Sequence, residues 1–190
     1  MDKILVVNKP KDCTSRDVIN KLNKIFNEKK MGHTGTLDPF ATGVLVVCMG
    51  KYTKLVDLLT NLDKEYVGTI KIGIKTDTLD ITGNILEKRE CKTTKENVNK
   101  VFKSFIGTYM QEVPKYSAVK IDGKKLYEYA RNNESIELPK RKVSIYSLDL
   151  LNFTNDEISF KTKVSKGTYI RSLAQDICNS LNIIGTLSSL

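Results

Sequence analysis

Residues 32–45 read Gly-His-Thr-Gly-Thr-Leu-Asp-Pro-Phe-Ala-Thr-Gly-Val-Leu, and this stretch is the most informative part of the chain. From Lys29 to Gly43 the sequence has neither an alternating nor a helical hydrophobic period. It also holds three of the 11 glycines and one of the four prolines. Such a composition predicts an ordered loop rather than a helix or a strand. The apolar run from Val44 to Cys48 then predicts a buried strand.

Asp38 is the candidate functional group of this loop. Pro39 fixes its own φ and restrains the backbone of the residue before it. The neighbouring Leu37 and Phe40 shield the carboxylate partly from water. A carboxylate that is held in place and partly desolvated suits a nucleophile or a general base. The alternative is an ordinary Asp-Pro turn, in which the aspartate caps nearby amides.

The flanking sequence predicts strands and helices that do not alternate one to one. Strands are expected at residues 4–7, 44–48, 65–74, 116–121, 142–150 and 158–164, the last two as a hairpin. Helices are expected after a cap at Thr14 or Ser15, over 55–62, after a Thr93-x-x-Glu96 capping box, and from Ile170 to Leu181. An Asp122-Gly123 turn is expected after the fourth strand. This order predicts an α+β fold, with an antiparallel or mixed sheet and helices packed outside it. We find no repeat or linker and expect one domain over residues 1–190.

Composition narrows the classes of function. The 190 residues carry 31 Lys and Arg against 22 Asp and Glu, a formal charge of +9. This charge suits a negatively charged partner but equally fits a genome-wide drift of the composition toward lysine and asparagine that has no binding role. The single histidine excludes a zinc site with two His ligands. The four cysteines are far apart in sequence, which argues against zinc ribbons, iron–sulfur motifs and a disulfide framework. We expect no metal, no cofactor and no membrane segment, and a cytoplasmic location.

Three further side chains are functional candidates, and two of them, Arg171 and Tyr66, have an ordinary interpretation as well. Arg171 is a candidate partner for Asp38, because a guanidinium keeps a desolvated carboxylate ionised; otherwise it is a solvated residue of a first helical turn. Tyr66 is a candidate for stacking on a nucleobase; otherwise it is a tyrosine at the edge of the core. His33, between glycines, could fill the gap that an extruded base leaves.

The sequence resembles a known family, the bacterial tRNA pseudouridine synthases of the TruB class. Residues 32–45 resemble the catalytic motif of that family. The resemblance extends in family order along the chain, through Leu5-x-x-Asn8-Lys9-Pro10 with Thr14-Ser15, Asp63-Lys64-x-Tyr66, residues 114–131 beginning Pro114-x-Tyr116-Ser117-Ala118, and Ser165-Lys166-Gly167-Thr168-Tyr169-Ile170-Arg171. It implies the pseudouridine synthase catalytic fold, which is an α+β fold with a central mixed, mostly antiparallel sheet flanked by helices and loops. It also implies isomerisation of uridine 55 in the T loop of tRNA.

The resemblance also implies roles for individual residues. Asp38 would be the catalytic carboxylate, paired with Arg171, and Tyr66 would stack on the target base and handle a proton. Tyr169 would contact the flipped nucleotide. The remaining substrate contacts would come from His33, beside the vacated base position, and from Leu190, packed on the bound nucleotide.

The family chain normally continues beyond Leu190 into basic residues and a small RNA-binding domain, so we expect a catalytic domain without that extension. The expected partner is the tRNA T stem-loop, with no obligate protein partner and with Lys9, Lys120 and Lys166 as candidates for phosphate contacts. A non-catalytic tRNA-binding or tRNA-folding protein is the main alternative. A Mg²⁺-dependent nuclease using Asp38, Asp77 and Asp80 is a weaker one.

Overall fold

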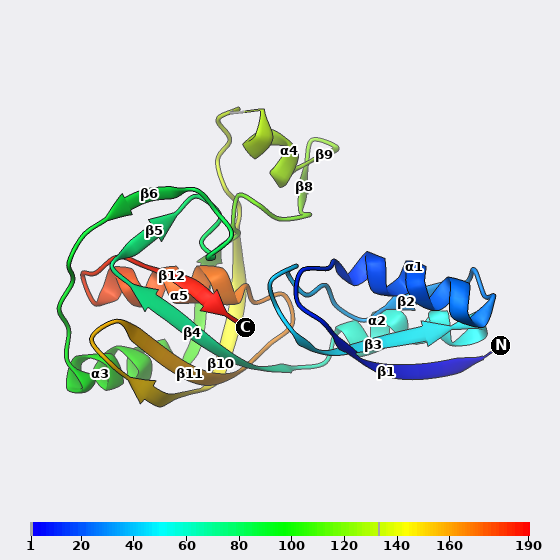
Figure 1. Cartoon of the computed structure of the whole chain (residues 1–190), viewed down its shortest axis with the longest axis horizontal. Helices are drawn as coiled ribbons and strands as arrows, with labels where there is room; N and C mark the ends of the chain where they lie inside the picture. The colour runs from blue at the N-terminus through cyan, green and yellow to red at the C-terminus, as the bar shows by residue number, and fades with distance from the viewer. Residues whose placement is uncertain (1, 133) are drawn as a thin grey trace. The chain divides into compact units, whose positions relative to one another are not determined.

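The computed structural model describes residues 2–132 and 134–190, which divide into two compact units. The first unit comprises the residues up to Leu62 together with Leu190, and the second runs from Asp63 to Ser189. Each unit has a sheet of its own (Figure 1). The expectation of one domain over residues 1–190 stays a prediction.

The first unit is a three-stranded antiparallel sheet with a helix packed on it. The strands lie in the order β1 (Lys3–Lys9), β3 (Gly43–Met49) and β2 (Met31–His33). Helix α1 (Ser15–Phe26) packs against the sheet, and the buried cluster consists of Val18, Ile19, Leu45 and Val47. A short 3₁₀ helix, η1 (Gly50–Leu55), and α2 (Val56–Thr60) follow β3.

Helix α1 begins where the sequence predicts. The Thr14 side chain accepts a hydrogen bond from the amide of Asp17 at 3.0 Å, and the Asp17 carboxylate accepts one from the Thr14 amide at 2.9 Å. This reciprocal capping box satisfies two amides that the helix itself leaves unpaired. The first turn of α1 is thereby held, and Ser15 at its start is only 1% exposed.

The second unit is built on a five-stranded sheet. The strand order is β12 (Gly185–Ser189), β4 (Lys64–Ile72), β11 (Glu157–Val164), β10 (Lys140–Phe153) and β7 (Gly107–Glu112). Every pairing within it is antiparallel, and an isolated bridge between Asp80 and Leu187 is parallel. Two small hairpins accompany it, β5 (Ile74–Thr76) with β6 (Ile85–Lys88) and β8 (Lys120–Ile121) with β9 (Lys124–Lys125). The expected α+β class is confirmed.

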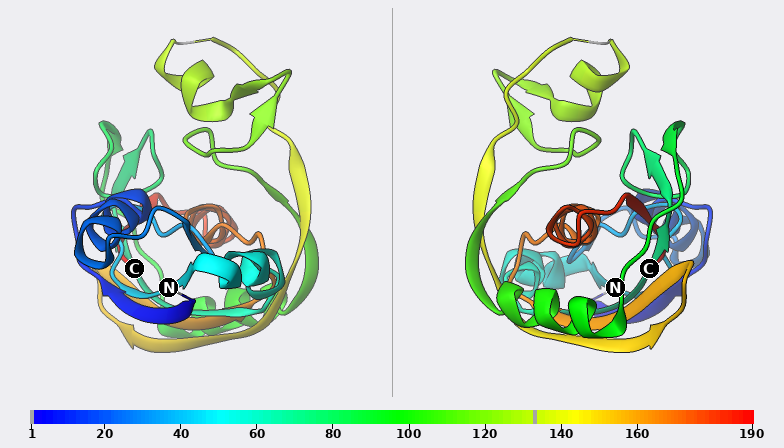
Figure 2. Two further views of the ribbon diagram at one scale, coloured as in Figure 1. Left: turned by 90° about the vertical axis from the view of Figure 1, so that its right-hand side faces the viewer. Right: turned by 90° about the vertical axis from the view of Figure 1, so that its left-hand side faces the viewer.

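Two helices cover the buried face of this sheet, α3 (Lys95–Phe105) and α5 (Ile170–Ser180) (Figure 2). Phe102 of α3 packs edge-on against Phe160 of β11, with ring centroids 6.3 Å apart. Gly68 lies opposite Phe160 in the register, and a Cβ there would approach that ring to 2.8 Å. The missing side chain of Gly68 therefore makes room for the ring that joins α3 to the sheet.

The segment with β8, β9 and α4 (Leu126–Arg131) extends from the sheet, joined to it through β7 and β10 (Figure 2). Asp122 and Gly123 have φ of 51° and 81°, which is the geometry that a tight two-residue hairpin turn requires. The predicted Asp122-Gly123 turn is confirmed. None of the helices among residues 2–132 and 134–190 has the length and apolar character to cross a membrane.

Several predicted elements need correction. The expected loop at 29–43 contains β2, which pairs with β3 and whose hydrogen bonds the local sequence does not reveal. The predicted strand at 116–121 is reduced to Lys120–Ile121. The helix cap is Thr94, one residue later than predicted, and its side chain accepts from the amide of Asn97. The strand predicted at 65–74 stops at Ile72, because Gly73 has φ of 83° and turns the chain into β5.

Candidate active site

The predicted site residues fall in both units. The first unit holds Lys9, His33, Asp38 and Leu190. The second holds Tyr66, Lys120, Lys166, Tyr169 and Arg171. The pairing of Asp38 with Arg171 stays a prediction, as do the roles that the resemblance implies for each residue.

The backbone on both sides of Asp38 is held by groups from elsewhere in the first unit. The Ser15 hydroxyl accepts a hydrogen bond from the amide of Leu37 at 3.0 Å and donates to the Leu37 carbonyl. The Pro39 carbonyl accepts from the amide of Asp12 at 2.9 Å. The Asp38 carbonyl itself accepts from the amide of Ala41, which closes a turn. The Asp38 carboxylate is half-buried. The backbone of the residue on each side of it, Leu37 and Pro39, is fixed by hydrogen bonds.

Lys9 is the main support of this loop, and the prediction that it contacts phosphates is wrong. Its side chain is 0% exposed. The ammonium donates to the carbonyls of Pro10, Cys13 and Pro39 at 2.9, 2.7 and 3.1 Å. Three bonds use all three donors of an ammonium group, so none remains for an external phosphate. Lys9 and Ser15 are supporting residues that a motif alone did not distinguish from binding residues.

We expect Lys9→Met to lower the free energy of unfolding by about 2 kcal/mol, because three carbonyls lose their common donor. The measurement is urea unfolding followed by circular dichroism. Lys11→Met is the matched control, since Lys11 is an exposed lysine of the same segment. Equal stability of the two variants would show that the buried ammonium does not hold the loop.

His33 lies at the end of β2, half-buried beside the Asp38 loop. Burial lowers the pKa of its imidazole, the charge of Arg16 lowers it further, and the carbonyl of Gly35 opposes both. The ring is therefore mainly neutral at pH 7. Moving a neutral ring out of water and against a nucleobase costs less free energy than moving a charged one. At the other end of the chain, the carbonyl of Leu190 accepts from the amide of Thr42, which places Leu190 beside the same loop.

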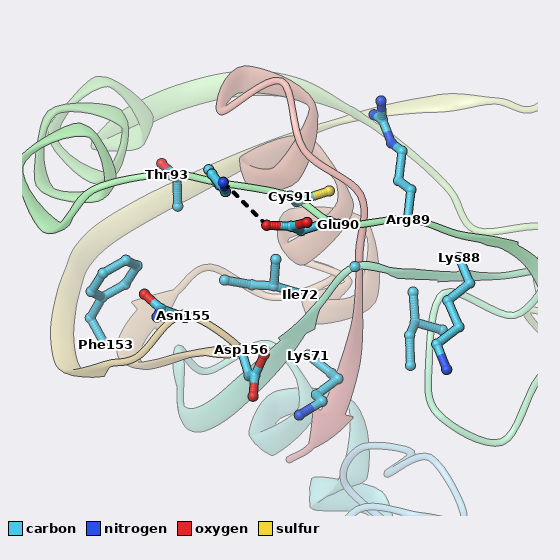
Figure 3. Close-up of a pocket in the computed structure, with 13 residues that line it drawn as sticks. Lys71, Ile72, Lys88, Arg89, Glu90, Cys91, Thr93, Phe153, Asn155 and Asp156 are labelled. Atoms are coloured by element: carbon cyan, nitrogen blue, oxygen red, sulfur yellow. Dashed lines mark ion pairs between the residues drawn. The ribbon is translucent and has the colours of Figure 1, made fainter.

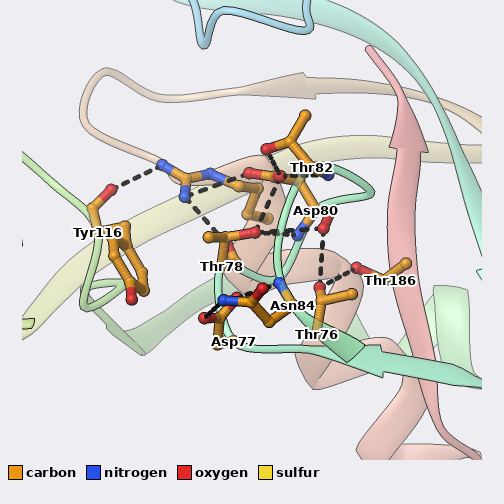
Figure 4. Close-up of polar contacts among 9 residues, drawn as sticks. Thr76, Asp77, Thr78, Asp80, Thr82, Asn84, Tyr116 and Thr186 are labelled. Carbon is orange, nitrogen blue, oxygen red and sulfur yellow. Dashed lines mark hydrogen bonds and ion pairs between the residues drawn. The ribbon is translucent and has the colours of Figure 1, made fainter. Parts of the chain in front are cut away.

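Arg171 is buried, with 6% of its surface exposed, which excludes the solvated-helix interpretation. Its guanidinium donates to the carbonyls of Thr78 and Tyr116, both at 3.0 Å. It also lies 3.6 Å from the carboxylate of Asp80, which is itself buried (Figure 4). A planar guanidinium can bind several acceptors in this way because its donors point in fixed directions. Arg171 thereby joins the first turn of α5 to two loops.

Asp80 belongs to a tight turn between β5 and β6. One of its oxygens accepts from the Thr78 hydroxyl, the Thr82 hydroxyl and the Thr82 amide at 2.9, 2.6 and 3.0 Å (Figure 4). Asp77 in the same turn accepts from the amide and side chain of Asn84. Both carboxylates hold this loop, and that of Asp80 also faces Arg171, which argues against the predicted use of Asp77 and Asp80 as cation ligands. Within the described residues there is no cluster of three or more metal-ligating side chains.

Tyr66 and Tyr169 are both half-buried in the second unit. Tyr66 lies on β4 opposite Thr162, on the same strand face as Gly68 and Ile70. The prediction that Tyr66 lies on the same face as the isoleucines is therefore confirmed for Ile70 and Ile72, and β4 ends before Ile74. Tyr169 precedes α5 and acts as its N-cap residue.

Lys120 and Lys166 are exposed, and both are therefore accessible to phosphate groups. Basic and aromatic side chains also lie against one another on β9 and α4. Lys124 lies 4.5 Å from the ring centroid of Tyr129, and Arg131 lies 5.2 Å from that of Tyr127. Cations held against rings in this way suit a surface that meets nucleic acid.

A cavity of about 900 Å³ in the second unit holds none of the predicted site residues. It lies between the end of β4, the segment after β6 and the β10–β11 turn (Figure 3). Two of its lysines lie near carboxylates, with Lys92 3.3 Å from Glu90 and Lys71 3.7 Å from Glu157. Lys88, Arg89 and Asp156 line the cavity as well.

Comparison with known proteins finds related sequences that align with the whole chain. Residues 23–170 match the model of the TruB family pseudouridylate synthase, N-terminal domain. The chain is 48% identical over 190 residues to tRNA pseudouridine synthase B of Fusobacterium nucleatum and covers 66% of that protein. It is 46% identical to the protein of the same name from Acholeplasma laidlawii, of which it covers 68%.

Solved structures show the same fold. A chain in the crystal structure of a Cbf5–Nop10–Gar1 complex superposes with a TM-score of 0.76 at 28% identity, over 98% of this chain and 46% of that one. A chain in the structure of an H/ACA RNP bound to a substrate RNA containing 2′-deoxyuridine gives 0.72 at 26% identity, over 98% and 45%. The chain spans about two thirds of the length of the curated relatives it matches. Its sequence and its fold together place it in the TruB family of pseudouridylate synthases.

Proposed function

We propose that this protein is an isomerase that converts uridine 55 in the T loop of tRNA to pseudouridine, in the cytoplasm and without a cofactor. The observation that carries the proposal is the Asp38 loop. In a chain nearly half identical to tRNA pseudouridine synthase B, both peptides beside Asp38 are held by buried groups, Ser15 and Lys9. Turn formation alone does not require such support, whereas a reacting carboxylate does.

The reaction breaks the N1–C1′ bond of the uridine, turns the uracil and joins its C5 to C1′. The carboxylate of Asp38 stabilises the positive charge at C1′ or bonds to it, as carboxylates do in glycoside chemistry. The proton at C5 is lost to solvent and N1 gains one, so the step needs no redox partner. The base must leave its stack first, and this costs less in a loop than in a duplex.

The other site residues have complementary roles in this proposal. Tyr66 and Tyr169 contact the flipped nucleotide, and Arg171 pairs with Asp38. His33 and Leu190 lie beside the Asp38 loop, where they contact the RNA around the vacated position and the bound nucleotide. Phosphate contacts come from exposed residues, among them Lys120 and Lys166.

The test is release of tritium from a T-arm RNA carrying [5-³H]uridine at position 55 alone. We expect the protein to release one equivalent of tritium per RNA, equally with and without EDTA. Salt-dependent RNA binding without tritium release would favour the non-catalytic tRNA-binding protein instead. RNA cleavage that EDTA abolishes would favour the nuclease.

A further inference from the structure

Gln111 makes an unusual pair of contacts with the residue that starts α5. It lies on β7 and is 1% exposed. Its side-chain oxygen accepts from the amide of Tyr169 at 2.8 Å, and its side-chain nitrogen donates to the Tyr169 carbonyl at 3.1 Å. One amide side chain thus binds both polar groups of a single peptide residue, in the manner of a neighbouring β-strand.

The contacts of Gln111 provide hydrogen-bond partners that the start of α5 otherwise lacks. Tyr169 is the N-cap residue, and no side-chain cap bonds the first turn of α5 in the described structure. An unpaired buried amide is costly, and Gln111 pairs the Tyr169 amide from another element. Three residues after Tyr169, in the first turn of α5, the Ser172 hydroxyl donates to the carbonyl of Glu112 at 2.8 Å. The start of α5 is therefore attached to two successive residues of β7, Gln111 and Glu112.

The orientation of the Gln111 amide is set from its other side. The Tyr109 hydroxyl donates to the carboxylate of Asp176 at 3.0 Å, so its oxygen accepts from the Gln111 side-chain nitrogen, at 2.7 Å. This directs the nitrogen toward Tyr109 and the oxygen toward the Tyr169 amide, and a flipped amide would put two donors face to face. Burial raises the pKa of Asp176, and the hydrogen bond from Tyr109 opposes that rise.

We propose that Gln111 is a positioning residue for the reaction, which holds the Tyr169 backbone so that Tyr169 meets the nucleotide and Arg171 meets Asp38 in the productive geometry. The proposal rests on the proposed function. Only Ile170 separates Tyr169 from Arg171, and both lie at the start of α5, which Gln111 attaches to β7. Misplacement by about 1 Å of groups that position a substrate costs on the order of 10²-fold in rate.

Gln111→Met tests the proposal, because methionine fills a similar volume without hydrogen-bonding groups. We expect kcat for tritium release to fall by roughly 10²-fold while KM for the T-arm RNA changes by less than about threefold, since phosphate contacts lie elsewhere. Hydrogen exchange measured by NMR is expected to accelerate at the Tyr169 amide and to remain unchanged in β11. Tyr109→Phe is expected to lower kcat less, because the bonds between Gln111 and Tyr169 persist.

Gln175→Met is the matched control, since Gln175 is half-buried on α5 and its side-chain nitrogen bonds Asn179 on the same helix. We expect wild-type kcat from it. Suppose that the wild-type protein is active. If Gln111→Met then keeps full kcat, or if the hydrogen-exchange rate of its Tyr169 amide is unchanged, the positioning role is overturned and the proposed function is not. Faster exchange throughout the second unit would overturn it too, by showing a general structural defect. An inactive wild-type protein overturns the proposed function, and the positioning role with it.

Discussion

Asp38→Asn is expected to reduce tritium release from the labelled T-arm RNA by about 10⁴-fold or more, since removing a reacting nucleophile has effects of this order. Asparagine keeps the size of the side chain and loses its charge, so it can neither stabilise positive charge at C1′ nor bond to it. RNA affinity should change little, because the phosphate contacts remain. The measurement is single-turnover tritium release with saturating protein, together with filter binding of the same RNA.

Asp57→Asn is the matched control for charge. Asp57 is an exposed aspartate of α2 in the same unit, and we expect wild-type activity from its variant. Thermal unfolding of both variants checks that the Asp38 loop stays folded. Activity of Asp38→Asn within tenfold of wild type would contradict the assignment of Asp38 as the reacting group and would restore the interpretation of an Asp-Pro turn.

Arg171→Met should lower the free energy of unfolding by about 3–5 kcal/mol, the range measured when one partner of a buried ion pair is removed. The substitution leaves the Asp80 carboxylate buried without its cation, and it leaves the carbonyls of Thr78 and Tyr116 without a donor. Urea unfolding followed by circular dichroism measures the loss. Adding Asp80→Asn to the variant should restore part of the stability, because the unpaired charge is then gone.

Arg89→Met provides the comparison. Arg89 forms an ion pair with Glu87 at 3.1 Å, but the two side chains are 52% and 46% exposed. Pairs of that kind contribute about 0–1 kcal/mol, so we expect a small effect. Similar losses for the two arginines would refute the structural role of Arg171. A double-mutant cycle between Arg171 and Asp38, scored on kcat, then tests the predicted catalytic pairing.

The elements that the sequence predicted well are those that local signals specify. The Thr14 cap, the Asp122-Gly123 turn, the β10–β11 hairpin and α5 each follow from neighbouring residues, through side-chain caps, positive φ or apolar spacing. The predictions that failed depend on distant partners. β2 exists because β3 pairs with it, and the stretch after Tyr116 is mostly not a strand, although its residue types favour one.

The site shows the same division. Residue type and motif order were enough to propose Asp38, Tyr66 and Arg171, because the chemistry restricts which side chains can act. They did not distinguish Lys9, which supports the loop, from exposed lysines. The carbonyl of Pro39 that Lys9 binds lies 30 residues away along the chain. Burial, and not residue type, separates a supporting lysine from a binding one.

Reading the amino acids in order was sufficient for the α+β class and the family, and for proposing Asp38 as the reacting carboxylate, since caps, turns and motifs act over a few residues. Folding in three dimensions was needed to bury Lys9 under the Asp38 loop, to pair Arg171 with Asp80 and to bring Gln111 to Tyr169. These contacts join residues between 30 and 91 positions apart. Their partners are selected by packing and by the cost of leaving buried polar groups unpaired, which no short stretch of sequence records.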